Sequence, residues 1–202
     1  AMCCVTKILR RFYTNSSWRF SNFSGSCASL KITLMRRIIN LFAPYEIYFA
    51  TVVDLNACID SLNMISVGDR AMVIKTWLNG WATTNRIKGE FARDCLLGCC
   101  GEPDSLNHYL RCPRIYACQL HIIPRTSEDP LIRCGLACPG RINLAVTACA
   151  FSAYHALKAR INHEFEGCIP THINMTTYWI VFAQSFAAAV GECSLTQMLF
   201  DP

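Results

Sequence analysis

The chain has 202 residues, of which 52% are hydrophobic and only 16% are charged. So apolar a composition excludes a disordered chain, and the length is sufficient to bury a core within one domain, or within a small domain that carries an arm. The low charge content also favours a chain that buries much of its surface or docks on partners.

Positive charge is concentrated at the N-terminal end. Seven of the 19 Lys and Arg residues fall in residues 1–45, which contain no Asp or Glu, so the other 12 share the remaining sequence with all 14 acidic residues. We therefore expect a basic N-terminal arm at 1–45 and a helical domain at 46–202. The arm could be a transit segment, a docking arm or part of a longer polypeptide.

Apolar residues at helical spacing predict helices along most of the chain. A short basic helix at 5–12 and a Ser- and Gly-rich linker come first, and later helices are expected at 30–42, 49–62, 69–81, 143–160 and 176–193. Asp69 is the expected N-cap of its helix, and Trp77 and Trp81 should lie one turn apart against the core. No apolar run reaches the ~20 residues that a membrane-spanning helix needs. The predicted fold is mainly α.

Five of the 14 cysteines fall between residues 95 and 118, and part of this cluster has the spacing C-x3-C-x8-H-x3-C. Three cysteines and one histidine are a common tetrahedral ligand set for structural zinc. Gly98 and Gly101 would allow the tight turn that brings the first two sulfurs together. We expect a zinc knuckle embedded in the helical domain at 94–113. Its predicted ligands are Cys95, Cys99, His108 and Cys112.

The second half of the knuckle is expected to be helical. Asp104 or Ser105 would cap a short helix that carries His108 and Cys112 at positions i and i+4, on one face. Pro113 would end that helix directly after the last ligand.

Several alternatives remain open at the sequence level. Cys100 is adjacent to Cys99, and either could be the second ligand. The segment could also be a cysteine-rich loop that only packs. A second site could use Cys118 or His121 with the C-x3-C pair at 134–138.

Three motifs follow one another along the chain: Trp77-Leu-Asn-Gly-Trp81, Cys95-Leu-Leu-Gly-Cys99 and Asp104-Ser-Leu-Asn-His108-Tyr-Leu-Arg-Cys112-Pro113. In this order they resemble the zinc-binding region that follows the polymerase domain in non-LTR retrotransposon reverse transcriptases, especially the versions abundant in dinoflagellate genomes. The similarity covers about residues 70–195. It departs from the family at Cys134, where a tryptophan is expected, and residues 1–65 match nothing in it. The resemblance implies a module that grips template RNA or target DNA.

Catalytic motifs are missing from the sequence. It has no Tyr/Phe-x-Asp-Asp motif to hold catalytic magnesium ions, no Gly-rich phosphate loop, no Gly-x-Ser-x-Gly and no His-Glu-x-x-His. We therefore do not expect this chain to be an enzyme on its own.

The predicted function is a non-catalytic, retroelement-derived zinc-binding module that binds RNA or DNA. Its expected contacts are the basic residues around the knuckle: Arg86, Lys88, Arg111 and Arg114. The alternative is a structural accessory subunit of a larger, for example organellar, assembly that docks through the basic arm and apolar surface. Cysteines scattered through apolar helices favour a reducing intracellular compartment, either the nucleus or an organelle.

Overall fold

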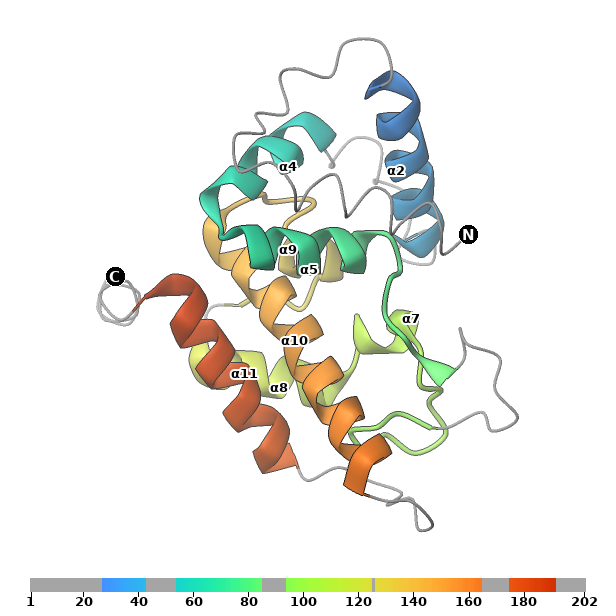
Figure 1. The fold of residues 1–202 in the computed structure, drawn as a ribbon, viewed down its shortest axis with the longest axis vertical. Coiled ribbons are helices and arrows are strands. Elements are labelled where there is room, and N and C mark those ends of the chain that lie inside the picture. Colours follow the sequence, from blue (N-terminus) through green and yellow to red (C-terminus); the bar gives the residue numbers. More distant parts are fainter. Residues whose placement is uncertain (1–26, 43–53, 85–93, 125, 165–174, 192–202) are drawn as a thin grey trace.

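The computed structural model describes residues 27–42, 54–84, 94–124, 126–164 and 175–191 (Figure 1). Within these ranges the chain forms no β-strand, and its β-type pairing is limited to one bridge between Asp94 and Pro103. The prediction of a mainly α-helical fold is confirmed. The elements are α2 (Cys27–Phe42), α4 (Leu55–Ser61), η3 (Leu62–Met64), α5 (Val67–Trp77), α7 (Leu106–Tyr109), α8 (Pro113–Ile122), α9 (Pro130–Arg133), α10 (Arg141–Glu164) and α11 (Met175–Val190).

Helix α10 is the central element, and both α5 and α11 pack along it (Figure 1). Small side chains allow this close approach, because Ala145, Ala148 and Ala153 are completely buried. A helix covered from more than one side needs apolar residues on more than one face, so its hydrophobic periodicity is weak. The prediction of a buried helix at 143–160 therefore finds most of α10 but not its ends.

Helix α11 contributes a row of large side chains to the core. Tyr178, Phe182, Phe186 and Val190 recur every four residues, and each is at most 1% exposed. The helix ends at Val190, three residues before the predicted end, because Gly191 adopts a left-handed conformation with φ of 79°. Such a glycine is a common helix stop.

Helix α5 differs from its prediction at both ends. Its N-cap is Ser66 and not Asp69, which lies in the first turn. The helix ends at Trp77, and Asn79 then takes a positive φ of 53°, so Trp81 lies beyond the helix. Both tryptophans are nevertheless buried in the core, as expected, at 0% and 2% exposure.

Replacing Ser66 with alanine is expected to destabilise the protein by about 1 kcal/mol. The Ser66 hydroxyl accepts a hydrogen bond from the Asp69 backbone N–H at 3.1 Å and donates one to the Asp69 carboxylate at 2.6 Å. Urea unfolding of the two proteins would measure the change. Ser66→Thr is the matched control, since it keeps a hydroxyl that can both accept and donate and should retain most of the stability. Equal stability of the alanine variant would contradict this role.

Helices α8 and α9 lie between residues 113 and 133, where the apolar pattern predicts no helix. Each starts with a proline at its first position, Pro113 and Pro130, where the missing N–H costs nothing and the fixed φ suits a helix. The Asp129 side chain also caps α9 by accepting from the Leu131 N–H at 2.8 Å. Pro113 and Pro130 therefore mark where helices begin.

Part of the predicted basic arm is helical. Residues 27–42 form α2, which packs against α5 and buries Ile38 and Leu41. The predicted helix at 5–12 lies outside the described residues. None of the described helices is both long enough and apolar enough to cross a membrane.

Candidate metal centre

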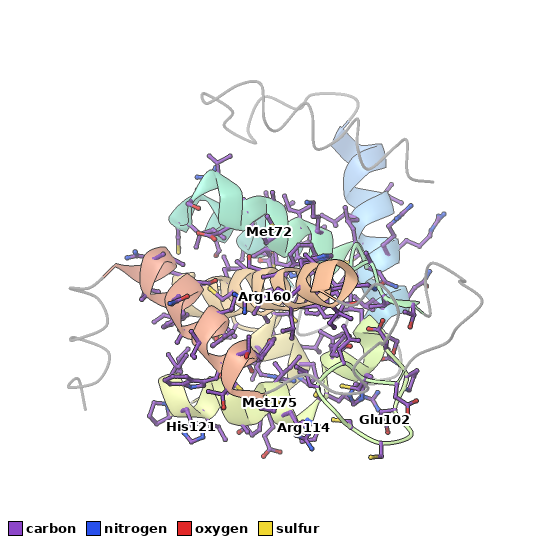
Figure 2. All side chains as sticks on the ribbon, turned by 60° about the horizontal axis from the view of Figure 1, so that its bottom comes forward. Met72, Glu102, Arg114, His121, Arg160 and Met175 are labelled. Carbon is purple, nitrogen blue, oxygen red and sulfur yellow. The ribbon has the colours of Figure 1, made fainter. Side chains whose placement is uncertain are left out.

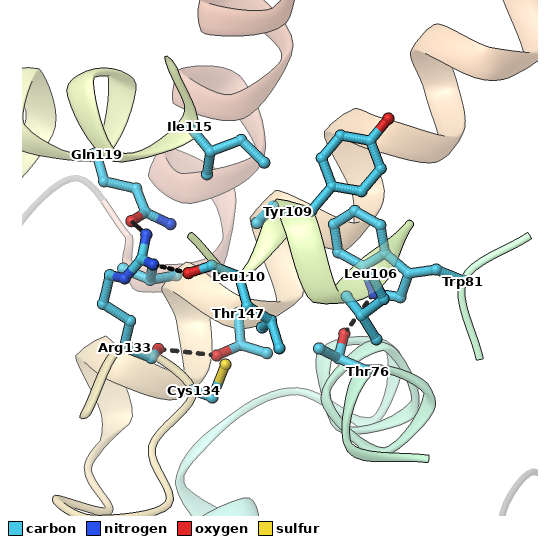
Figure 3. A pocket seen from close by; sticks show the side chains of 12 residues that line it. Thr76, Trp81, Leu106, Tyr109, Leu110, Ile115, Gln119, Arg133, Cys134 and Thr147 are labelled. Atoms are coloured by element: carbon cyan, nitrogen blue, oxygen red, sulfur yellow. Dashed lines mark hydrogen bonds between the residues drawn. The ribbon is translucent and has the colours of Figure 1, made fainter. Parts of the chain in front are cut away.

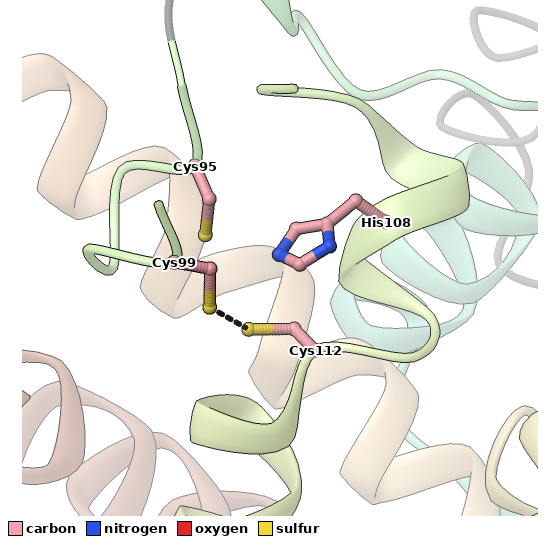
Figure 4. Close-up of side chains that lie close together, drawn as sticks. All are labelled: Cys95, Cys99, His108 and Cys112. Atoms are coloured by element: carbon pink, nitrogen blue, oxygen red, sulfur yellow. Dashed lines mark hydrogen bonds between the residues drawn. The ribbon is translucent and has the colours of Figure 1, made fainter. Parts of the chain in front are cut away.

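The four predicted ligands converge in space. One ligand atom from each of Cys95, Cys99, His108 and Cys112 lies within 4.8 Å of the others, as Figure 4 shows. Cys95 and Cys112 are fully buried, His108 is 8% exposed and Cys99 is half-buried. Cys100 is exposed and does not belong to the group, so the geometry selects Cys99 from that pair. The cluster is a Cys3His group that could hold a metal ion.

The first half of the cluster is a tight loop closed by backbone hydrogen bonds. The Cys95 N–H donates to the Glu102 carbonyl at 2.7 Å, and the Gly98 N–H donates to the Cys95 carbonyl at 2.9 Å. Gly98 and Gly101 both have positive φ, at 83° and 73°, which a side chain would disfavour. The two glycines thus turn the chain so that Cys95 and Cys99 face the same point.

The second half is built differently from its prediction. Ser105 is the N-cap of α7, and its hydroxyl accepts from the His108 N–H at 3.2 Å. Helix α7 ends at Tyr109, so His108 and Cys112 do not share one helical face. Cys112 is instead the N-cap of α8, and Pro113 starts that helix rather than ending α7. The two ligands are brought together by the turn between two helices.

His108 presents its two ring nitrogens to different partners. Nδ1 lies 3.1 Å from the Glu102 carboxylate. Nε2 is buried, has no hydrogen-bond partner in the described part of the chain, and lies on the side of the ring that faces the sulfurs (Figure 4). A buried nitrogen without a partner is costly, and a metal ion among the thiols would satisfy it.

Without a metal, the clustered thiols share protons unequally. The Cys112 thiol lowers the pKa of Cys95 to about 4, against the effect of burial. The same interaction raises the pKa of Cys112, and burial raises that of Cys99. Burial lowers the pKa of His108, but nearby Cys95 and Glu102 outweigh it and raise that pKa overall. These shifts favour a thiolate at Cys95 beside a protonated His108, so a metal ion that binds here has to displace the protons held by His108, Cys99 and Cys112.

A buried carboxylate anchors the cluster to the core, a role that sequence reasoning missed. Asp104 is 0% exposed and accepts hydrogen bonds from the Tyr109 hydroxyl at 2.7 Å, the Tyr154 hydroxyl at 3.1 Å and the Thr84 N–H at 2.7 Å. Lys158 Nζ lies 3.6 Å from the same carboxylate. An aspartate between predicted ligands could signal such an anchor, although sequence alone does not reveal its partners.

The tyrosine in this network also reaches the loop itself. The Tyr109 hydroxyl accepts a hydrogen bond from the Leu96 N–H at 3.1 Å, one residue after the ligand Cys95. The Tyr109 ring packs against Trp81, with 5.5 Å between ring centroids, and Trp81 packs against Tyr154 on α10. The network thus fixes the metal-binding loop relative to the central helix.

A second buried group contacts the turn between α7 and α8 that leads to Cys112 (Figure 3). Arg133 is 6% exposed, donates to the Gln119 side-chain oxygen at 3.0 Å, and donates to the Leu110 carbonyl, two residues before Cys112. It borders a cavity of about 30 Å³ between α5, α7, α8 and α10. So small a space admits one or two water molecules and no larger ligand.

The cluster also borders a larger cavity of about 320 Å³. The ligands Cys99 and His108 line this cavity, and Arg111 lines it as well. Arg111 and Arg114 are exposed, and Arg114 is labelled with Glu102 at the lower edge of Figure 2. Of the four basic residues predicted to contact nucleic acid, Arg86 and Lys88 lie outside the described residues.

The fold and the cluster define this chain as a mainly helical protein with a Cys3His group that could hold a metal ion. Comparison with models of known protein families, with curated proteins and with solved structures gives no match.

Proposed function

We propose that the chain is a non-catalytic zinc-binding module of retroelement origin that binds nucleic acid. The observation that supports the zinc-binding part of the proposal is the convergence of the four ligand atoms within 4.8 Å. Soft thiolates with one imidazole favour zinc among the common divalent ions. Two sulfurs bound to one tetrahedral zinc lie about 3.8 Å apart, given Zn–S bonds of about 2.3 Å. The observed distance between Cys99 Sγ and Cys112 Sγ is 3.7 Å.

The role proposed for the metal is structural. Bound zinc would supply a cross-link between the loop that carries Cys95 and Cys99 and the turn that carries His108 and Cys112. Four protein ligands fill a tetrahedral zinc ion and leave no position for a reactive water. The residues themselves fit this role, because the buried Nε2 atom of His108 gains a partner and the thiols lose their competing protons.

The nucleic-acid part of the proposal rests on basic residues next to the cluster. Arg111 and Arg114 flank Cys112 and Pro113 and are both exposed. Arg111 borders the cavity of about 320 Å³, so a phosphate group or an unpaired base could enter beside it. The other two predicted contacts, Arg86 and Lys88, lie outside the described residues, so the proposal rests on Arg111 and Arg114.

Replacing both Arg111 and Arg114 with alanine is expected to weaken binding of single-stranded RNA and to flatten its salt dependence. Each lost phosphate contact reduces the slope of log K against log salt by about 0.7 for single strands and about 0.9 for duplex DNA. Fluorescence anisotropy of zinc-loaded protein at several salt concentrations measures both effects. The double lysine variant keeps the charge and should keep the slope. Salt-insensitive binding, or none by the wild-type protein, would overturn the nucleic-acid proposal.

A second candidate function, a structural accessory subunit, is favoured by apolar residues on the surface. Trp179 and Ile180 are adjacent on α11 and are 40% and 42% exposed. Large apolar side chains that gather on one surface often mark a contact with another protein. Light scattering separates the two candidate functions. If the chain is an accessory subunit, the isolated chain should self-associate or aggregate through this surface, and the Trp179→Glu variant should be monomeric again.

A further inference from the structure

We propose that Glu102 is a positioning residue for the metal centre: its carboxylate holds the His108 ring so that Nε2 is the ligating nitrogen, and it thereby raises the metal affinity. The inference rests on the metal centre proposed above but not on nucleic-acid binding. Glu102 would then belong to the metal centre as a supporting residue, beside the four residues that bind the metal.

The orientation of the ring carries the argument. The Glu102 carboxylate lies 3.1 Å from Nδ1, so that nitrogen must carry its proton to donate the hydrogen bond. In a neutral imidazole the other nitrogen, Nε2, then has a free lone pair. That nitrogen is the buried one without a hydrogen-bond partner, on the side of the ring that faces the sulfurs (Figure 4). The carboxylate therefore fixes both the tautomer and the direction of the ring.

Glu102 is also joined to the other half of the cluster through its backbone. Its carbonyl accepts the hydrogen bond from the Cys95 N–H at 2.7 Å. Glu102 thus contacts Cys95 through its main chain and His108 through its side chain. This double connection holds Cys95 and His108 close together before a metal binds. Metal binding then has to order less of the chain, so its cost in conformational entropy is smaller.

The carboxylate lies outside the group of four ligand atoms, as expected of a residue that supports the centre without binding the metal. Its side chain is 56% exposed, whereas the His108 side chain is 6% exposed, so the contact lies at the edge of the buried cluster. Carboxylates that accept a hydrogen bond from a ligating histidine increase its basicity and restrict its rotation. Loss of such a partner typically costs about 10- to 100-fold in metal affinity.

The test compares zinc affinity in the full chain with Glu102 as wild type, Gln or Ala, by competition with a chromophoric chelator. Glu102→Ala should bind zinc about 10- to 100-fold more weakly. Glu102→Gln should lie between the two, since its amide oxygen still accepts from Nδ1 but carries no charge. Glu128→Gln, which changes an exposed glutamate outside the cluster, is the matched control and should match the wild type.

A spectroscopic readout separates positioning from a general loss of stability. In long-range ¹H–¹⁵N correlation spectra, wild-type His108 should show a protonated Nδ1 and a metal-bound Nε2, and the alanine variant should show exchange broadening or mixed coordination. Wild-type affinity in Glu102→Ala, or ligation through Nδ1 in the wild type, would overturn the inference. If the wild type binds no zinc, the proposed metal centre fails instead, and if it binds zinc but no RNA, only the nucleic-acid proposal fails.

Discussion

Replacing Cys112 with alanine is expected to abolish tight metal binding and to unfold the segment around residues 94–113. Cys112 is fully buried and is also the N-cap of α8. Its Sγ atom lies 3.7 Å from Cys99 Sγ. Structural zinc supplies about 10–16 kcal/mol of apparent binding free energy in zinc-finger peptides, so the free energy of unfolding should fall by several kcal/mol. Thermal melting with and without a chelator measures this loss.

The matched control for this prediction is Cys100→Ala. Cys100 is adjacent to Cys99, but it is exposed and outside the cluster, so its loss should leave metal content and melting unchanged. A chelator should lower the melting temperature of the wild type and the Cys100 variant, and it should have little effect on the Cys112 variant. If the Cys112 variant melts like the wild type and still responds to the chelator, this cysteine is not a ligand.

Replacing Asp104 with alanine is expected to destabilise the protein by about 3–5 kcal/mol. The change removes the acceptor for two tyrosine hydroxyls and one backbone N–H, and it leaves the Lys158 ammonium group without its carboxylate. Because Lys158 is only 15% exposed, its charge would be poorly solvated. Urea unfolding at neutral pH measures the difference in the free energy of unfolding.

Two further variants test the cause of that loss. Asp60→Ala removes an exposed aspartate on α4 and should change stability by no more than about 0.5 kcal/mol. Adding Lys158→Met to the Asp104 variant removes the ammonium group that has lost its carboxylate and should restore part of the stability, since the two residues are coupled. Strictly additive effects of the two substitutions would contradict an ion pair between Asp104 and Lys158.

Much of the helical fold follows from local sequence signals. The long helices α10 and α11 are predicted because their apolar residues extend over many turns. Their ends were not predicted well, since these depend on single residues such as Gly191, whose left-handed conformation ends α11. Helix α8 was missed because Pro113 was interpreted as the end of a helix, and no helix was expected at Pro130, although proline at a first helical position is favourable.

The sequence predicts most of the ligands of the candidate site, but it does not predict the residues that hold those ligands in place. Cysteine and histidine spacing predicts Cys95, His108 and Cys112, but it leaves Cys99 and Cys100 as alternatives, and the fold brings Cys99 into the group. The helix expected to carry both His108 and Cys112 was wrong, since α7 ends at Tyr109. The roles of Asp104 and Glu102 depend on partners that folding brings together, such as Lys158, which is 54 residues after Asp104 in the sequence. The spacing of residues in a single sequence does not reveal those contacts.

The most direct test of the central claim is the metal content of the purified full chain, together with the absorption spectrum of its cobalt-substituted form. The metal centre predicts one zinc ion per chain and, with cobalt, the strong visible and thiolate charge-transfer bands of tetrahedral Cys3His coordination. Both signals should be lost in the Cys112→Ala variant and kept in the Cys100→Ala variant. A wild-type chain that folds fully without zinc, and that gives no tetrahedral cobalt spectrum, would contradict the claim.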